Sequence, residues 1–314
     1  KIGDLSLSMA VSERAYVDNM GGLDNLSLGY ENDNWNLSAS YQRYFTDGAS
    51  RFSGMTNPIL NLASNVVTTG AEYKAGDWSF GGRGYSGLVT DESLLENDPT
   101  VSAQFMPGQL GLMSGAESHV AYDGDKFGVS VSFGMARESD TLLGAVTDGL
   151  LRLGAGDTTY VDVVSRYDLS DRFGVSARAT FARTTSDATG AMVLGLTDIE
   201  SNAFAFSANI GDFEFTVAQP LGITDGALQY AHAEYDVVEV ATGQYDLVVR
   251  DARVADLSLC PDKREVRLAA TYRQKLGEFT DGALGMIYRV NPNHTDEFGN
   301  ESIFMMKLSH RLGI

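Results

Sequence analysis

Four histidines are the imidazole groups that could act as acid or base catalysts in this chain of 314 residues. They are His119, His232, His294 and His310. No Gly-x-Ser-x-Gly or His-Glu-x-x-His pattern surrounds them, so local sequence places no nucleophile or metal beside any of them. A pair assembled from loop residues, such as His232 with Glu234 or Asp236, stays open. The sequence therefore predicts no catalytic residue and a protein that is not an enzyme.

Metal and cofactor chemistry has little support in the sequence. Cys260 is the single cysteine, and the acidic loops contain no Asp-x-Asp-x-Asp-Gly calcium-binding pattern. We therefore expect no metal and no cofactor. The chain has 23 Lys+Arg against 42 Asp+Glu, a net charge of −19, which argues against a nucleic-acid partner.

The other side chains that could take part in binding or catalysis are charged residues. They occupy one register of the alternating segments. We expect nine of them to line an interior: Glu72, Arg83, Glu117, Asp162, Arg166, Arg178, Arg267, Arg273 and Arg289. The opposite register of the same segments is apolar or small, as in the run from Phe173 to Phe181. A period of two residues is typical of β-strands with two different faces.

These strands predict a membrane-spanning barrel. No stretch approaches the roughly 20 apolar residues of a transmembrane helix, so spanning would fall to strands of about 9 to 11 residues. Lys or Arg facing lipid costs roughly 2 to 4 kcal/mol, and the apolar register avoids both. We predict an all-β fold, a transmembrane antiparallel up-and-down β-barrel in which residues 1–314 form a single domain.

Tight turns rich in Asp, Gly and Asn separate pairs of strands, and bulky residues flank them. Aromatic rings at a constant height predict a girdle at the membrane interface. The expected girdle residues are Tyr30, Trp35, Tyr73, Trp78, Tyr122, Phe127, Tyr167 and Phe173, with Ile210 and Phe213 as an aliphatic variant.

Long segments alternate with the tight turns and carry much of the negative charge. This asymmetry predicts short periplasmic turns and long acidic extracellular loops. The predicted strands are 3–12, 24–31, 34–45, 66–75, 77–87, 114–122, 126–137, 157–168, 172–184, 201–210, 212–219, 263–276, 281–290 and 302–314, fourteen in all. About 12 to 14 strands are expected and sixteen are possible, because residues 226–259 alternate and could form a hairpin projecting outside.

The interior charges have two interpretations. The arginines could line a path for an anionic solute or hold an acidic linker. Alternatively they pair with Glu72, Glu117, Asp162 and Glu214 and fill the barrel, since buried charges must be paired. Basic and acidic residues are mixed along the strands, which favours pairing.

The last 120 residues carry three short motifs in a recognisable order. They comprise Gln219, Pro220 and Leu221, then Arg264 and Glu265 opening a strand, then Tyr288, Arg289, Pro292 and His294. This third of the chain resembles the C-terminal translocator barrels of alphaproteobacterial subtilisin-like autotransporters. The resemblance implies a barrel that passes or holds an N-terminal passenger and is inserted by the barrel-assembly machinery.

The chain departs from that family in two ways. An assembly signal is expected on the last strand at Phe304, Met306, Leu308, Leu312 and Ile314, but it ends on an aliphatic residue where such barrels usually end on an aromatic one. The serine-peptidase signatures His-Gly-Thr and Gly-Thr-Ser-Met-Ala are absent. With no signal peptide before Leu5, the sequence is expected to be a mature form or a fragment.

The pattern as a whole predicts a non-enzymatic barrel in the outer membrane of a Gram-negative bacterium. Its expected partners are outer-membrane lipid and lipopolysaccharide, the assembly machinery and a passenger. A translocator and anchor domain is the first interpretation. A free-standing porin for small, possibly anionic, solutes and a filled structural or adhesive barrel remain alternatives.

Overall fold

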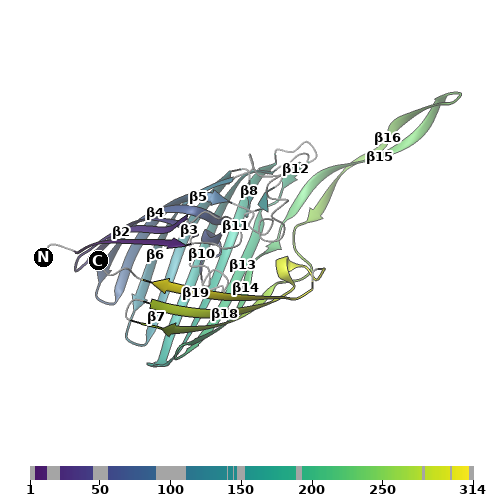
Figure 1. Ribbon diagram of the computed structural model, residues 1–314. Coiled ribbons are helices and arrows are strands. Elements are labelled where there is room, and N and C mark those ends of the chain that lie inside the picture. The colour runs from purple at the N-terminus through teal and green to yellow at the C-terminus, as the bar shows by residue number, and fades with distance from the viewer. Residues whose placement is uncertain are drawn as a thin grey trace.

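The computed structural model describes residues 4–12, 22–44, 56–89, 111–139, 141–143, 145–146, 153–188, 193–277, 280–297 and 299–310. Within these ranges the chain is almost entirely β-strand, and fourteen strands form one antiparallel sheet that curls into a barrel (Figure 1). Sheet order follows chain order throughout. The predicted all-β, up-and-down barrel of about 12 to 14 strands is therefore confirmed.

The strands of the barrel are long, most of them between ten and sixteen residues. They are β1 (Asp4–Ser12), β2 (Gly22–Glu31), β3 (Trp35–Tyr44), β4 (Ala63–Ala75), β5 (Trp78–Val89), β6 (Gly111–Asp123), β7 (Phe127–Ser139), β10 (Leu153–Ser170), β11 (Phe173–Ala188), β13 (Ile199–Ile210), β14 (Phe213–Asp225), β17 (Val266–Lys275), β18 (Thr280–Val290) and β19 (Glu301–His310). Among the described residues no ladder joins β1 to β19, the two ends of the sheet order.

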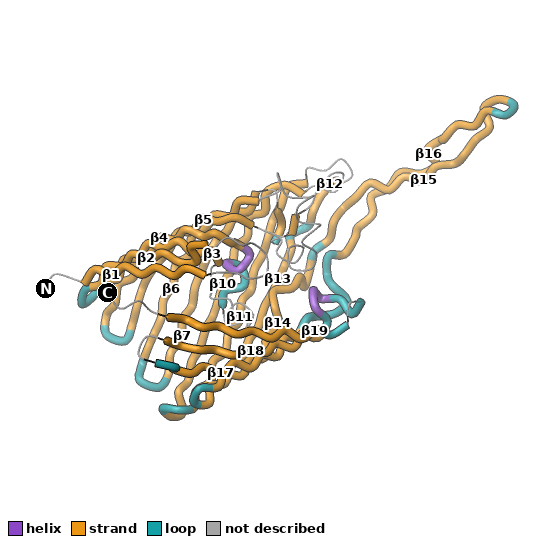
Figure 2. Tube along the Cα trace, in the orientation of Figure 1, coloured by secondary structure: helices purple, strands orange, loops and turns teal. Residues whose placement is uncertain are grey.

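The two ends of the barrel differ. Tight turns close one end, and the glycines in two of them, Gly76 and Gly211, take the left-handed φ values of 62° and 60° that a side chain disfavours. The strand ends that the longer connections join lie at the other end, from which a ribbon projects (Figure 2). Strand β1 begins at the tight-turn end, because Asp4 lies opposite Glu31 beside a tight turn, and with an even number of strands β19 finishes at the same end.

The projecting ribbon is a hairpin of β15 (Ala227–Ala241) and β16 (Gln244–Ser258). At its base β12 (Val193–Leu196) pairs with β15, which makes a small three-stranded sheet separate from the barrel. The sequence left open whether residues 226–259 form an external hairpin, and the structure shows that they do. A further two-residue pair, β8 (Thr141–Leu142) and β9 (Ala145–Val146), lies in another long connection.

The outer face carries an apolar band of regular height. On β7, β10 and β11 the outward register runs from an aromatic residue to a charged residue ten positions away: Phe127 to Arg137, Tyr167 to Asp157, and Phe173 to Arg183. Between these limits Phe133, Met135 and Phe181 are exposed. Ten strand residues rise about 33 Å, and a tilt of about 40° leaves a band about 25 Å tall, the height of a membrane barrel's apolar belt.

The described residues contain only 3-10 turns as helices, namely η1 (Leu60–Leu62) and η3 (Pro292–His294). None is long or apolar enough to cross a membrane.

Candidate functional site

The predicted girdle residues lie just above the tight turns and meet across neighbouring hairpins. The rings of Trp35 and Tyr73 are 5.1 Å apart, and those of Trp78 and Tyr122 are 5.2 Å apart. Further along, the register pairs Phe127 with Tyr167 and Phe173 with Ile210. Tyr30 lies opposite Leu5 and Leu37. Phe213 pairs with Ile210 across its own tight turn, and its ring centre lies 4.7 Å from that of Tyr272. Each ring pair therefore joins one hairpin to the next.

Three predicted interior arginines face carboxylates of neighbouring strands. Arg83 Nη2 donates to Glu117 Oε1 at 2.9 Å, and Arg178 Nε donates to Asp162 Oδ1 at 2.8 Å. Thr180 adds a hydrogen bond to the same Asp162 oxygen. Arg273 Nη2 donates to Glu214 Oε2 at 3.0 Å. Pairing of this kind is what the filled-barrel interpretation requires.

Other interior charges use partners that sequence reasoning did not assign. Glu72 lies 3.1 Å from His119 across the intervening strand, and Gly81 makes this possible because a Cβ there would lie 2.4 Å from His119 Cε1. Arg166 bridges Asp123 at 2.9 Å and Asp168 at 3.0 Å near the tight turns. His119 is thus a hydrogen-bond partner of Glu72 on the inner wall.

Glu265 is the centre of a group of ion pairs. Its carboxylate accepts from Arg267 Nε at 2.6 Å and from Arg289 Nε at 2.8 Å, while Arg289 also donates to Glu301 at 2.7 Å. Glu265 is 1% exposed. All six arginines predicted to line the interior therefore have carboxylate partners, which leaves little support for an anion path along them.

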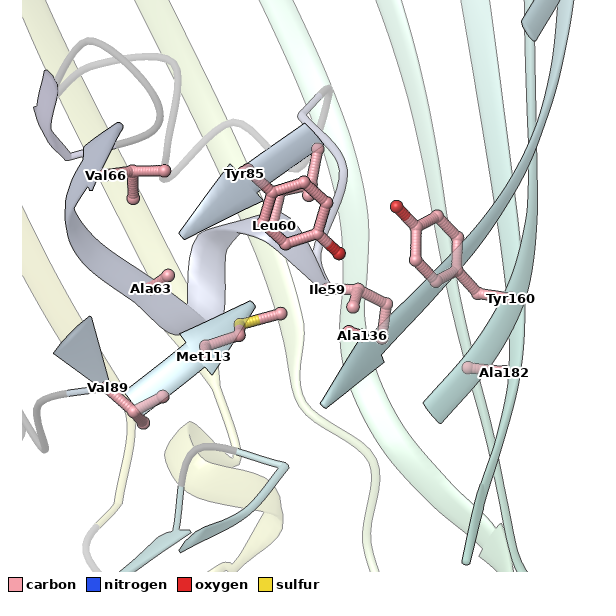
Figure 3. Packing of buried hydrophobic residues seen from close by; sticks show 10 residues of the cluster. All are labelled: Ile59, Leu60, Ala63, Val66, Tyr85, Val89, Met113, Ala136, Tyr160 and Ala182. Atoms are coloured by element: carbon pink, nitrogen blue, oxygen red, sulfur yellow. The ribbon is translucent and has the colours of Figure 1, made fainter. Parts of the chain in front are cut away.

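A segment of the long connection between β3 and β4 occupies the interior. We call residues 56–62 the lumen segment. Ile59 and Leu60 are completely buried, and they pack among inward side chains that include Tyr85, Met113 and Tyr160 (Figure 3). These three residues belong to β5, β6 and β10. The lumen segment therefore covers the inner wall of these strands at the long-loop end.

Polar contacts from the same wall also fix the lumen segment. Asn57 Nδ2 donates to Glu117 Oε2 at 3.2 Å, and Tyr160 donates its hydroxyl to the same oxygen at 2.9 Å. Gly115 and Gly134 make room for the two tyrosines, since a Cβ at either would lie within 2.4 Å of a tyrosine ring or hydroxyl. Glu117 was predicted to face the interior, but its contact with a loop was not. The apolar run Pro58-Ile59-Leu60 was the available signal.

Residues from all three resemblance motifs meet at the long-loop end of β13, β14, β17 and β18. We call Gln219, Leu221, Arg264, Glu265, Arg289 and His294 the rim cluster. Arg264 donates to the Asn202 and Gly222 carbonyls at 3.0 and 3.1 Å, and to the Gln219 amide oxygen, with that amide turned toward it, at 2.6 Å. The β13–β14 ladder shifts register on either side of the Asn202–Gly222 pair, so these carbonyls lie at an irregular part of the ladder. Arg264 thus joins the backbones of β13 and β14 at this irregularity.

His294 is held from both ring nitrogens in the rim cluster. Its Nδ1 accepts from the Glu265 amide at 3.0 Å, and its Nε2 lies 3.0 Å from the Leu221 carbonyl, to which only a protonated Nε2 can donate. Burial lowers the pKa of His294 below its usual 6.5, although the Leu221 contact opposes this. The neutral Nε2-H tautomer therefore fits the site.

Burial and neighbouring charges also act against each other on the pKa of Glu265, but here the neighbouring charges have the larger effect. Burial raises its pKa, but hydrogen bonds and charges from Arg289 and Arg267 outweigh burial and lower the pKa to about 2. The carboxylate stays ionised at any physiological pH. Both Glu265 oxygens and His294 Nδ1 already accept hydrogen bonds within the rim cluster, an arrangement that stabilises structure.

The remaining predicted residues are placed as follows. Phe304 and Met306 on β19 are exposed, 76% and 83%, on the outer face, and Leu308 belongs to the same strand. Leu312 and Ile314 lie outside the described residues. His232 and His310 belong to β15 and β19, on different parts of the molecule. Over the described part of the chain, no group of three His, Cys, Asp or Glu is arranged to hold a metal.

Comparison with family models and with curated proteins finds no match. Among solved structures, the chain is similar to the CymD monoaromatic hydrocarbon channel at 11% identity, covering 99% of this chain and 87% of that one, with a TM-score of 0.36. It is similar to the Pseudomonas putida toluene transporter TodX at 10% identity, with coverages of 90% and 81% and a TM-score of 0.35. A Pseudomonas aeruginosa FadL homologue gives 12% identity, coverages of 98% and 85%, and a TM-score of 0.35. These values assign no activity to this chain.

Proposed function

We propose that this chain is the translocator and anchor barrel of an autotransporter-type protein in the outer membrane of a Gram-negative bacterium. The apolar band contacts outer-membrane lipid and lipopolysaccharide, and the acidic loops face outside. The chain is inserted by the barrel-assembly machinery, and its lumen passes or holds an N-terminal passenger segment.

The observation that carries this proposal is the convergence of the resemblance motifs. Gln219 and Leu221, Arg264 and Glu265, and Arg289 and His294 are up to 75 positions apart in the sequence, yet they contact one another directly in the rim cluster. The order of the strands brings these three segments to the same end of the barrel, and there the side chains of the motifs bond to one another as well as lying close. These specific contacts support a shared structural unit and, with it, the resemblance to translocator barrels.

The direction of the chain also fits translocation. The start of β1 lies at the tight-turn end, which is the periplasmic end of an outer-membrane barrel. A segment placed before β1 must therefore cross the lumen to reach the long-loop side.

A surface-display experiment tests the proposal. An epitope on a flexible linker is fused ahead of Lys1, behind a signal peptide, and intact cells are stained with an antibody that cannot cross the outer membrane. A translocator brings the epitope to the surface. Epitopes inserted at Gly243, in the ribbon tip, and at Gly124, in a tight turn, give the external and periplasmic controls. An N-terminal epitope that stains only in permeabilised cells, with both controls correct, rules out translocation.

A second candidate is a solute channel that the lumen segment closes. The wall behind this segment carries Tyr85, Met113 and Tyr160, so a solute displacing Ile59 and Leu60 would be small and apolar. Uptake of such a compound into proteoliposomes, in a chain that fails to display the N-terminal epitope, would favour this function over translocation.

A further inference from the structure

The projecting ribbon of β15 and β16 has no role in the proposed translocation. Each strand has fifteen residues, so the ribbon extends about 50 Å along its length. It stands clear of the barrel for most of that length (Figure 1). A two-stranded hairpin is marginally stable alone in water, which suggests that a long one has a further partner.

One edge of the ribbon already accepts an added strand. Residues of β12 pair with Leu228, Gln229 and Tyr230 of β15, at the base of the ribbon. Beyond Tyr230, no described residue pairs with that edge of β15. The edge used by β12 therefore continues as an open template for strand addition.

The backbone register shows which groups this edge presents. The Thr197 amide donates to the Ala227 carbonyl at 3.0 Å on the β12 side, whereas the Leu259 amide donates to the Gly226 carbonyl on the β16 side. Backbone groups of alternate residues point to opposite edges of a strand. Ala231 and Ala233 consequently present their amides and carbonyls to the β12 side.

Charge and exposure indicate the chemistry of the partner. The ribbon carries six carboxylates, Glu234, Asp236, Glu239, Asp246, Asp251 and Asp256, against two arginines, Arg250 and Arg253. Arg253 already faces Glu234 at 2.9 Å, and Arg250 lies 3.8 Å from Asp236. Val237, Tyr245 and Val254 are at least 60% exposed on the same ribbon. A strand that complements these carboxylates and exposed apolar side chains is one in which basic and apolar residues alternate.

We propose that the β15 edge is a docking site for an extended, basic polypeptide strand, which adds beside Ala231 and Ala233 as a continuation of β12. Main-chain hydrogen bonds supply the geometry, and the carboxylates select positive charge. A second copy of this chain is a poor occupant, because two acidic ribbons repel. The proposal goes beyond translocation and does not depend on it.

The test uses the whole chain in zwitterionic detergent micelles and a fluorescent peptide of about twelve alternating Val and Lys residues, read by anisotropy. Ala233 and Ala252 lie opposite each other in the ladder, and their backbone groups point to opposite edges. Ala233→Pro removes an amide from the proposed docking edge, and Ala252→Pro makes the same change on the other edge. Neither removes a hydrogen bond between β15 and β16.

We expect the Val-Lys peptide to bind with an affinity that falls with salt. Ala233→Pro weakens it at least about tenfold, and Ala252→Pro leaves it within about twofold. A peptide N-methylated along one edge should not bind the unaltered chain, which tests strand addition without any mutation. Equal binding by the two proline variants, equal binding of a Val-Glu peptide, or a dimer of the unaltered chain that Ala233→Pro dissociates would each overturn the proposal.

Discussion

Shortening the two buried side chains of the lumen segment should release it from the barrel interior. Ile59 and Leu60 are both completely buried against the inner wall. Replacing a buried Ile or Leu by Ala costs about 2 to 5 kcal/mol each. The two residues are adjacent, so their losses are not fully additive. Even about 4 kcal/mol for Ile59→Ala with Leu60→Ala raises the released population about a thousandfold.

Single-channel recording in planar bilayers measures the consequence. The unaltered chain should conduct weakly because the lumen segment covers the inner wall, and the double variant should show larger or more frequent openings. Val67→Ala is the matched control, since Val67 lies on the outer face and is 53% exposed. It should leave conductance unchanged.

A separate measurement of release makes the result decisive. Asn61→Cys, in a chain carrying Cys260→Ser, reports exposure of the lumen segment to a thiol reagent that does not cross membranes. Full labelling in the double variant, together with unchanged conductance, would refute the reasoning that this segment closes the lumen.

Three further outcomes follow from the ion pairs, the rim cluster and the outer face. Arg178→Met should lower the free energy of unfolding in urea by about 3 to 5 kcal/mol, because it leaves the buried carboxylate of Asp162 without its cation; adding Asp162→Leu should recover much of that loss. The lowered pKa of His294 means that its neutral form stabilises the fold above pH 6.5 and that this contribution is lost as pH falls through the lowered value, so the protection factor of the Glu265 amide against hydrogen exchange should fall in mild acid, and this pH dependence should be absent in His294→Phe. Ala179→Arg, at the middle of the apolar band, should destabilise the barrel in lipid bilayers by about 2 to 4 kcal/mol, while Thr185→Arg, beyond Arg183, should have little effect in the same unfolding assay.

The strands and turns of the barrel could be predicted because both are encoded locally. The predicted strand 172–184 lies within β11, and 201–210 within β13, apart from one residue at the start of the first. Predicted boundaries are short at the long-loop end, as for 212–219 against Phe213–Asp225. There the strand rises beyond the apolar band, so both faces can be polar and the alternation weakens.

The lumen segment could not be predicted from alternation, since its burial depends on contacts with three distant strands. Asn57 reaches Glu117 across 60 positions, and nothing in its own neighbourhood indicates that partner. Glu265 was not recognised as an interior charge, although it lies in the predicted strand 263–276 and shares its register with Arg267. In the structure it lies just before β17, where Arg289 of the next strand along the sheet also reaches it.

The two halves of the barrel wall differ at the long-loop end, where one contacts the lumen segment and the other contains the rim cluster. Strands β5 to β11 bind the lumen segment through apolar contacts and Glu117. Strands β13 to β18 hold the rim cluster, where Arg264 donates to carbonyls at the irregular part of the β13–β14 ladder. The ribbon leaves the barrel between β14 and β17, and the rim cluster joins these same strands at its base. The rim cluster therefore lies where a long external hairpin most needs a rigid base, and loss of Arg264 should loosen the ribbon before it affects the lumen.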